Sequence, residues 1–147
     1  TQITPNGFDL TVEKIFEFDT KGRLDFSNAE REVPKGRPLE PEKKKPGDEY
    51  GWWILEEGIY KVRTNEVLNL PKNLIAIPFS RSSLLRMGGR ISNAVGDAGY
   101  SGKAEFLLIV GNANGIEVKE NARICQLIFF PIPTVEKGYE GIWQNLK

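Results

Sequence analysis

The sequence predicts an all-β fold with one short helix, and three observations carry that prediction. Short apolar runs recur along the chain, glycine, proline and asparagine separate them, and only one short stretch has helical character. Short strands with such spacing are typical of a sandwich, a barrel or a jelly roll. The 147 residues are enough for one domain with a buried core, and we expect a single domain over residues 1–147.

The expected elements follow this punctuation. The predicted strands cover residues 9–18, 58–63, 73–78, 102–110, 115–119 and 123–130. The predicted helix is the stretch Ser-Ser-Leu-Leu-Arg-Met-Gly at 82–88, with Ser82 as the N-cap and Gly88 at its end. If Trp52 and Trp53 lie in a further strand, their side chains point to opposite faces of it.

Residues 20–52 differ in character from the rest. The part from 30 to 49 contains four prolines, six acidic and six basic residues and almost no large apolar side chain. Such a stretch cannot offset its ordering entropy by burial. We therefore expect a mobile insertion between two strands at 20–52, and a C-terminal tail at 134–147.

Charge and hydropathy exclude several partners. Twenty basic residues balance twenty acidic ones, so no overall field attracts a nucleic acid or a membrane surface. The apolar runs are far shorter than the roughly 20 residues that cross a bilayer, and the first residues carry no signal pattern. We expect a cytoplasmic protein. The single cysteine, Cys125, lies in an apolar run and is interpreted as a buried hydrophobe.

The absence of histidine limits the chemistry. A chain without histidine has no Ser-His or Cys-His nucleophile pair and no zinc-deaminase signature. A zinc site is disfavoured as well, because histidine and cysteine supply most zinc ligands. Carboxylates, lysines and tyrosines remain for acid–base work, and magnesium remains possible.

Two segments could hold a ligand. Residues 79–86, Phe-Ser-Arg-Ser-Ser-Leu-Leu-Arg, offer hydroxyl and guanidinium donors that suit phosphate oxygens, although an ordinary capped helix has the same pattern. Residues 93–102, Asn-Ala-Val-Gly-Asp-Ala-Gly-Tyr-Ser-Gly, place glycines where a ligand could press against the main chain. A plain β-turn explains this second segment nearly as well.

The order of four motifs resembles the dUTPase and dCTP deaminase superfamily. The motifs are Asn6-Gly-Phe-Asp-Leu10, Arg81-Ser-Ser83, Gly96-Asp-Ala-Gly-Tyr-Ser-Gly102 and Arg123-Ile-Cys-Gln-Leu127. The connecting stretches Leu55-Glu-Glu-Gly-Ile-Tyr60 and Leu70-Pro-Lys-Asn-Leu74 look most like those of archaeal-type dUTPases and of deaminases. The resemblance covers nearly the whole chain apart from residues 20–52.

The resemblance implies a fold and an activity. Members of the superfamily have a distorted antiparallel jelly roll and assemble as homotrimers with shared active sites. For a dUTPase, the implied reaction converts dUTP and water to dUMP and pyrophosphate, with Mg²⁺ held by the triphosphate. Asp97 matches the aspartate that activates the attacking water, and Tyr100 matches the aromatic ring under the deoxyribose. Asp9 and Arg123 match positions that support the site. The implied substrate-binding residues are Arg81, Ser82, Ser83, Arg86, Asn93, Val95, Gly96, Gly99, Tyr100 and Gln126.

Two other functions stay open beside dUTP hydrolysis. The deaminases of the superfamily need no zinc and use a glutamate ten residues past the aspartate, where this chain has Leu107. Glu105 lies two residues earlier, and Arg86 matches an arginine that deaminases carry. A zinc-free dCTP deaminase, or an enzyme with both activities, is therefore the alternative. A third hypothesis is an inactive β-sandwich that binds a nucleotide or a partner.

Overall fold

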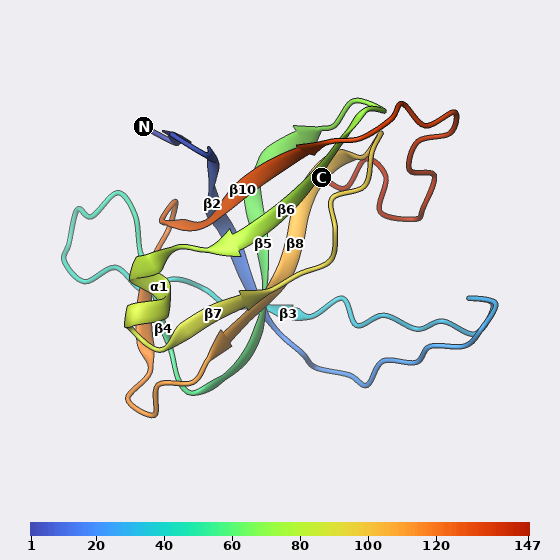
Figure 1. Cartoon of the computed structure of the whole chain (residues 1–147). Helices are drawn as coiled ribbons and strands as arrows, with labels where there is room; N and C mark the ends of the chain where they lie inside the picture. Colours follow the sequence, from blue (N-terminus) through green and yellow to red (C-terminus); the bar gives the residue numbers. More distant parts are fainter.

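The computed structural model describes all residues, 1–147, and its regular secondary structure is β-strand apart from one short helix (Figure 1). The strands and the helix follow one another in a fixed order along the chain. In that order the elements are β1 (Ile3–Thr4), β2 (Gly7–Glu17), β3 (Arg37–Pro38), β4 (Trp52–Leu55), β5 (Gly58–Asn69), β6 (Leu74–Ser80), α1 (Ser82–Arg86), β7 (Gly89–Ser92), β8 (Ser101–Val110), β9 (Ile116–Lys119) and β10 (Arg123–Pro131).

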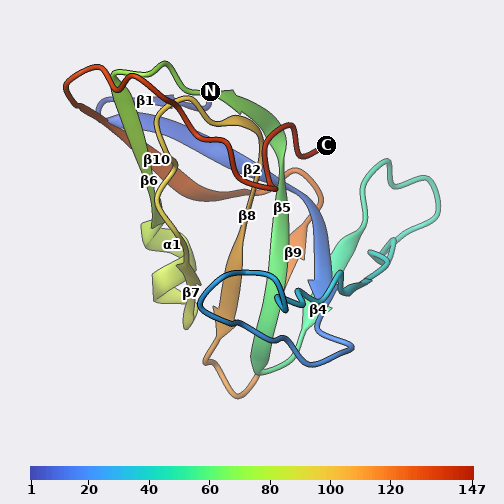
Figure 2. The ribbon, with the colours of Figure 1, turned by 90° about the vertical axis from the view of Figure 1, so that its right-hand side faces the viewer.

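The main sheet is antiparallel and nearly closes on itself. Its strands follow the order β6-β10-β2-β5-β8-β7, with β1 and β3 paired to β2, while β4 and β9 form a separate pair. Helix α1 joins the two edge strands β6 and β7 (Figure 2). The Ile91 amide of β7 donates a hydrogen bond to Ser80 Oγ of β6 at 3.0 Å. The predicted all-β, jelly-roll-like fold with one short helix is confirmed.

In strands β5 and β8, buried side chains alternate with less buried ones, as expected for strands with one face in the core. Their core-facing residues are Tyr60, Val62, Phe106, Leu108 and Val110. On the opposite face, the antiparallel register pairs Arg63 with Glu105 and Lys61 with Leu107. This second face bears two cations and one carboxylate, and it becomes a wall of the candidate site.

All six predicted strands are confirmed, with small shifts at most of their ends. The largest shift is in β5, which runs to Asn69 instead of ending at 63. The sequence pattern missed β7 and the two-residue strands β1 and β3, which are too short to show an alternation. The sequence pattern did not decide whether residues 52–55 form a strand. They form β4, in which Trp53 is buried and Trp52 is half-buried, as expected for side chains on opposite faces.

The predicted helix cap is wrong by one residue. The N-cap is Arg81, in an extended conformation and without a side-chain capping bond, and Ser82 is already helical. The chain leaves β6 through this extended residue, so strand geometry and not capping chemistry sets the start of α1. The end of the helix agrees with the prediction, because Gly88 adopts a left-handed φ of 82° directly after the C-cap.

Residues 18–51 leave the sheet and form two long excursions, which project to opposite sides in Figure 1. The first, residues 18–36, contains an isolated bridge between Arg23 and Glu32 and ends where β3 pairs with β2. We call residues 18–36 the arm. The second excursion returns to the sheet through a bridge between Glu42 and Trp52. The mobility expected for residues 20–52 stays a prediction.

Cys125 on β10 is fully buried, and burial raises the pKa of its thiol to about 12, so the sulfur stays protonated at neutral pH. Its interpretation as a small buried hydrophobe is confirmed. None of the helical structure is long and apolar enough to cross a bilayer.

Candidate functional site

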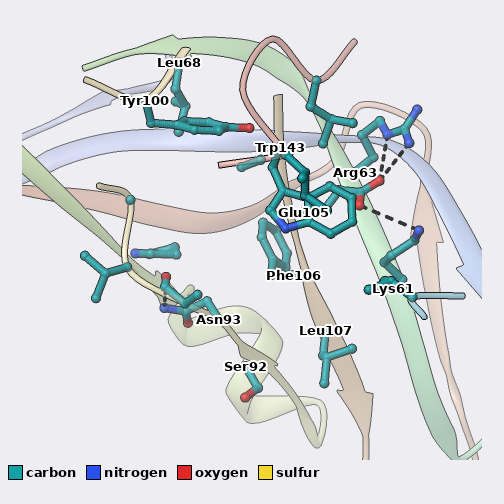
Figure 3. A pocket seen from close by; sticks show the side chains of 18 of the residues that line it. Lys61, Arg63, Leu68, Ser92, Asn93, Tyr100, Glu105, Phe106, Leu107 and Trp143 are labelled. Carbon is teal, nitrogen blue, oxygen red and sulfur yellow. Dashed lines mark hydrogen bonds and ion pairs between the residues drawn. The ribbon is translucent and has the colours of Figure 1, made fainter. Parts of the chain in front are cut away.

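A cavity of about 1150 Å³ opens against the face of β5 and β8 that is turned away from the core. The arm, the segment from 92 to 97, Tyr100 and the C-terminal tail contribute further walls. Figure 3 shows Ser92, Asn93, Tyr100 and Trp143 around the cavity. Strands β5 and β8 contribute Lys61, Arg63, Glu105 and Leu107 to its lining, together with Leu68, Ala104 and the edge of the core at Phe106. The cavity therefore combines an apolar floor with a small group of charges.

Five of the sequence-predicted site residues line this cavity: Asn93, Val95, Gly96, Asp97 and Tyr100. Gly96 pairs with Ala76 through two backbone hydrogen bonds of 2.7 and 2.9 Å. A Cβ atom at Gly96 would lie only 3.0 Å from the Ala76 carbonyl oxygen, so this close pairing favours glycine. It holds the following residue, Asp97, at the wall of the cavity. The exposed Asp97 carboxylate forms no hydrogen bond or ion pair within the chain, and it is free to accept a proton from bound water.

The ring of Tyr100 is fixed in place beside Asp97. Its hydroxyl donates a hydrogen bond to the Lys103 carbonyl, and its ring meets the edge of Tyr139 with centroids 5.4 Å apart. Burial, followed by the charges of Tyr139 and Glu105, raises the pKa of the Tyr100 hydroxyl, which stays protonated at neutral pH. The ring thus presents a rigid, neutral surface to the cavity.

The tail packs along the turn that contains Gly99. Gly99 has a left-handed φ of 83°, and a Cβ atom there would lie only 2.7 Å from Gly138 Cα of the tail. The turn conformation and the close approach of the tail therefore both require glycine at position 99. The Gln144 side chain accepts a hydrogen bond from the Ser101 amide at 2.8 Å and donates one to the Gly99 carbonyl at 3.0 Å. Through Tyr139, Ile142, Trp143 and Leu146, the tail becomes part of the cavity wall.

Asp9 gathers two of the predicted arginines at a different place. Its carboxylate is almost fully buried, and Oδ2 lies 3.1 Å from Arg81 Nε and 3.3 Å from an Arg123 nitrogen. The two arginine side chains remain 30% and 43% exposed, so their other donors reach the surface. A buried carboxylate between two cations is well placed to fix both guanidinium groups.

The remaining predicted residues lie near this arginine pair and not in the cavity. Ser82, Ser83 and Arg86 are exposed on α1, and their side chains make no hydrogen bond or ion pair within the chain. Gln126 on β10 lies opposite Asp9 in the register and donates its side-chain hydrogen bond to Thr4. One chain therefore brings most of the predicted residues together in two groups. We call Asn93, Val95, Gly96, Asp97 and Tyr100 the cavity group. We call Asp9, Arg81, Ser82, Ser83, Arg86, Arg123 and Gln126 the arginine group.

The position expected for a deaminase glutamate carries no carboxylate. Leu107 lines the cavity there, and its side chain cannot accept a proton. Glu105 also lines the cavity, but Arg63 binds its Oε1 with two nitrogens at 2.8 and 2.9 Å, and Lys61 Nζ lies 3.6 Å from its Oε2. Both carboxylate oxygens of Glu105 are thus engaged by cations (Figure 3).

Among the cavity-lining residues that sequence reasoning missed are Arg31, Lys61, Arg63 and Trp143. The two on β5 were detectable, because in the predicted strand 58–63 the basic residues alternate with Tyr60 and Val62. The other two lie in the arm and the tail. No periodic pattern indicates their position, because tertiary contacts alone bring them to the cavity.

The carboxylates of the chain do not form a metal cage of their own. No group of three metal-ligating side chains is present, and Asp97 is the one carboxylate of the cavity that no cation engages. Magnesium typically binds through one or two carboxylates together with substrate phosphates and water. The residues present therefore fit a magnesium ion that arrives with a phosphate-bearing substrate.

Comparisons with known proteins agree with this geometry. A "probable deoxyuridine 5'-triphosphate nucleotidohydrolase" of Methanosarcina mazei is 49% identical over 99% of this chain and 82% of its own length. A deoxyuridine 5'-triphosphate nucleotidohydrolase of Methanocaldococcus jannaschii is 38% identical over 98% of this chain and 88% of its own length.

A solved structure shares the fold. The crystal structure of the 2'-deoxycytidine 5'-triphosphate deaminase of Agrobacterium tumefaciens superposes with a TM-score of 0.63 at 21% identity, over 90% of this chain and 40% of that one. The family model described as dCTP deaminase-like matches residues 1–132. The resemblance seen in the four sequence motifs is thereby confirmed, and the chain belongs to the dCTP deaminase-like family.

Proposed function

We propose that this protein hydrolyses dUTP to dUMP and pyrophosphate. The observation that carries the proposal is the free carboxylate of Asp97 beside the fixed ring of Tyr100, on the wall of a cavity of about 1150 Å³. The names of the archaeal relatives, which are nucleotidohydrolases of deoxyuridine 5'-triphosphate, support the same substrate.

In the proposed reaction, Asp97 accepts a proton from water as the water oxygen attacks the α-phosphorus. The bond between the α-phosphorus and the α,β-bridging oxygen breaks, and pyrophosphate leaves with that bonding pair. A positioned carboxylate suits this step because it orients the water and takes its proton in the transition state. Tyr100 lies under the deoxyribose and leaves no room for a ribose 2′-hydroxyl, while Asn93, Val95 and Gly96 contact the nucleoside.

Mg²⁺ bound to the triphosphate would supply charge neutralisation during this displacement. No cation of the chain pairs with Asp97, so its carboxylate stays available at the wall of the cavity where the phosphates would bind. Glu105 plays no such part, because Arg63 and Lys61 occupy its carboxylate.

The arginine group completes the site from a neighbouring copy of the chain. None of Arg81, Ser82, Ser83, Arg86 and Gln126 lines the cavity of its own chain. Their hydroxyl, amide and guanidinium donors suit phosphate oxygens. We propose a homotrimer in which these donors bind the triphosphate of the neighbouring cavity, while Asp9 holds Arg81 and Arg123 from behind.

A second candidate is zinc-free dCTP deamination, alone or combined with hydrolysis. The match to the dCTP deaminase-like family model and the presence of Glu105 in the cavity favour it. Two observations weigh against it: Leu107 stands where the deaminase glutamate is expected, and Glu105 is held by two cations.

One experiment separates the functions. The purified protein is incubated with dUTP or dCTP in the presence of Mg²⁺, and pyrophosphate and ammonia are measured in parallel, with the Asp97→Asn protein as control for contaminating enzymes. Pyrophosphate from dUTP supports the proposal. Ammonia from dCTP without pyrophosphate would replace it with the deaminase, and turnover of neither nucleotide would leave a binding protein.

A further inference from the structure

We propose that Glu105 is a positioning residue that, through Lys61, holds the arm (residues 18–36) against the cavity. The kinetic part of this inference rests on the proposed function, but the structural part does not. Glu105 lines the same cavity as Asp97, yet its carboxylate engages Arg63 and Lys61 and is not free for chemistry.

The cluster around Glu105 is largely shielded from water. The side chains of Lys61, Arg63 and Glu105 are only 15%, 22% and 17% exposed. Both cations lie over the ring of Phe16, at 4.7 Å for Lys61 Nζ and 5.3 Å for Arg63 Cζ. Glu105 is the carboxylate that balances them, because no other acidic side chain forms an ion pair with either cation. Without it, two like charges would share one half-buried face.

Lys61 connects this cluster to the arm. Its ammonium group donates a hydrogen bond to the Lys35 carbonyl oxygen at 2.6 Å. This is the only hydrogen bond that joins residues 18–36 to the rest of the chain, because the others within this range are internal to the arm. The pairing of β3 with β2 starts just beyond it, and the Arg37–Glu17 ion pair there is exposed and contributes little.

The arm forms one wall of the cavity, with Phe18, Arg31 and Val33 in its lining. Glu105 fixes the Lys61 ammonium, and Lys61 fixes the main chain of the arm at Lys35. Loss of either link opens the arm more often, because a segment with few hydrogen bonds to the body opens locally. Such opening weakens nucleotide binding and leaves the water-activating step at Asp97 unchanged.

The first readout is limited proteolysis of the arm, which needs no enzymatic activity. Trypsin cleavage after Arg23 and Lys35 is followed by mass spectrometry in the wild type, Glu105→Gln, Lys61→Met and the double variant. Each single variant is expected to be cleaved about tenfold faster, as for the loss of one hydrogen bond to a charged group. The double variant is expected to be cleaved no faster than Lys61→Met, because Glu105 acts through Lys61.

A matched control and a rescue complete this readout. Glu13→Gln breaks the Lys103–Glu13 pair, which has similar exposure and lies outside the cavity lining, and its arm should be cleaved at the wild-type rate. Lys61→Arg keeps the charge and should restore most of the protection. Wild-type cleavage rates in both Glu105→Gln and Lys61→Met would overturn the proposal.

The second readout is the kinetics with dUTP. In Glu105→Gln, KM is expected to rise about tenfold while kcat stays within about twofold, because the effect is on binding alone. A large loss of kcat with an unchanged arm would contradict the inference and place Glu105 in the chemistry. If the wild type hydrolyses no dUTP, the proposed function fails, and proteolysis still decides whether Glu105 positions the arm.

Discussion

The cavity group and the arginine group differ in the contacts that hold their side chains. Around the cavity, main-chain pairing at Gly96, a rigid tyrosine ring and the tail build a shaped pocket with one free carboxylate. Around Asp9, one buried carboxylate holds two arginines, and further donors on α1 face the surface without a partner. The cavity has cations of its own, of which Lys61 and Arg63 are engaged by Glu105, and none of Arg81, Arg86 and Arg123 lines it.

The predicted site residues are therefore divided between two separate places on one chain. In the proposed function, the cavity group would bind the nucleoside and the attacking water, whereas the arginine group would bind the triphosphate. The proposed homotrimer would complete the site by pairing the two groups of neighbouring copies.

The largest effect is expected for Asp97→Asn in the cavity group. Turnover of dUTP should fall by about 10² or more, because a positioned acid–base group contributes 10²–10⁴. The substitution keeps the size of an exposed side chain without partners, so KM and the free energy of unfolding should barely change. Steady-state kinetics and urea unfolding measure both. A loss of stability in step with the loss of turnover would instead assign Asp97 a structural role.

The opposite signature is expected for Asp9→Asn in the arginine group. The side chain of Asp9 is 2% exposed and pairs with two arginines, so its neutralisation should lower the free energy of unfolding by about 2 kcal/mol. That value allows for the partial exposure of both arginines. Urea unfolding with Asp97→Asn as the matched comparison measures it. Unchanged stability would show that Asp9 does not hold the two guanidinium groups together.

The pairing of the two groups can be tested by mixing inactive variants. Asp97→Asn and Arg81→Ala should each retain little activity, but co-assembled at equal amounts they should recover about a quarter of the wild-type activity, because a quarter of the shared sites are intact. Arg81→Ala mixed with Arg86→Ala serves as control and should recover nothing, since both residues come from the same group. Absence of recovery in the first mixture would contradict a site shared between copies.

The smallest effect is expected for Tyr100→Ala. Removal of the ring opens space beside the sugar, and the preference for dUTP over UTP should fall by about tenfold, in the range that one shape contact contributes. The ratio of kcat/KM for the two nucleotides measures this change. Tyr139→Ala, which removes the edge contact but leaves the ring, should change the ratio much less. An unchanged ratio in Tyr100→Ala would remove its role in sugar discrimination.

The sequence alone determined the β-rich fold, most strands and the motif residues of both groups. It did so because burial imposes a period of two on strands such as β8, and because the left-handed turn at Gly99 favours glycine for a local reason. Both signals are short-range and survive in a single sequence. They singled out Asp97 and Tyr100, both of which line the cavity.

Only the tertiary structure decided how these residues are grouped. The separation of the arginine group from the cavity, the pairing of Glu105 with Arg63 and Lys61, and the contact of arm and tail with the pocket all depend on strand register and on packing between distant segments. Such contacts leave no periodic trace in the sequence. Their energies depend on which side chains share a shielded face, and that is set only once the sheet has closed.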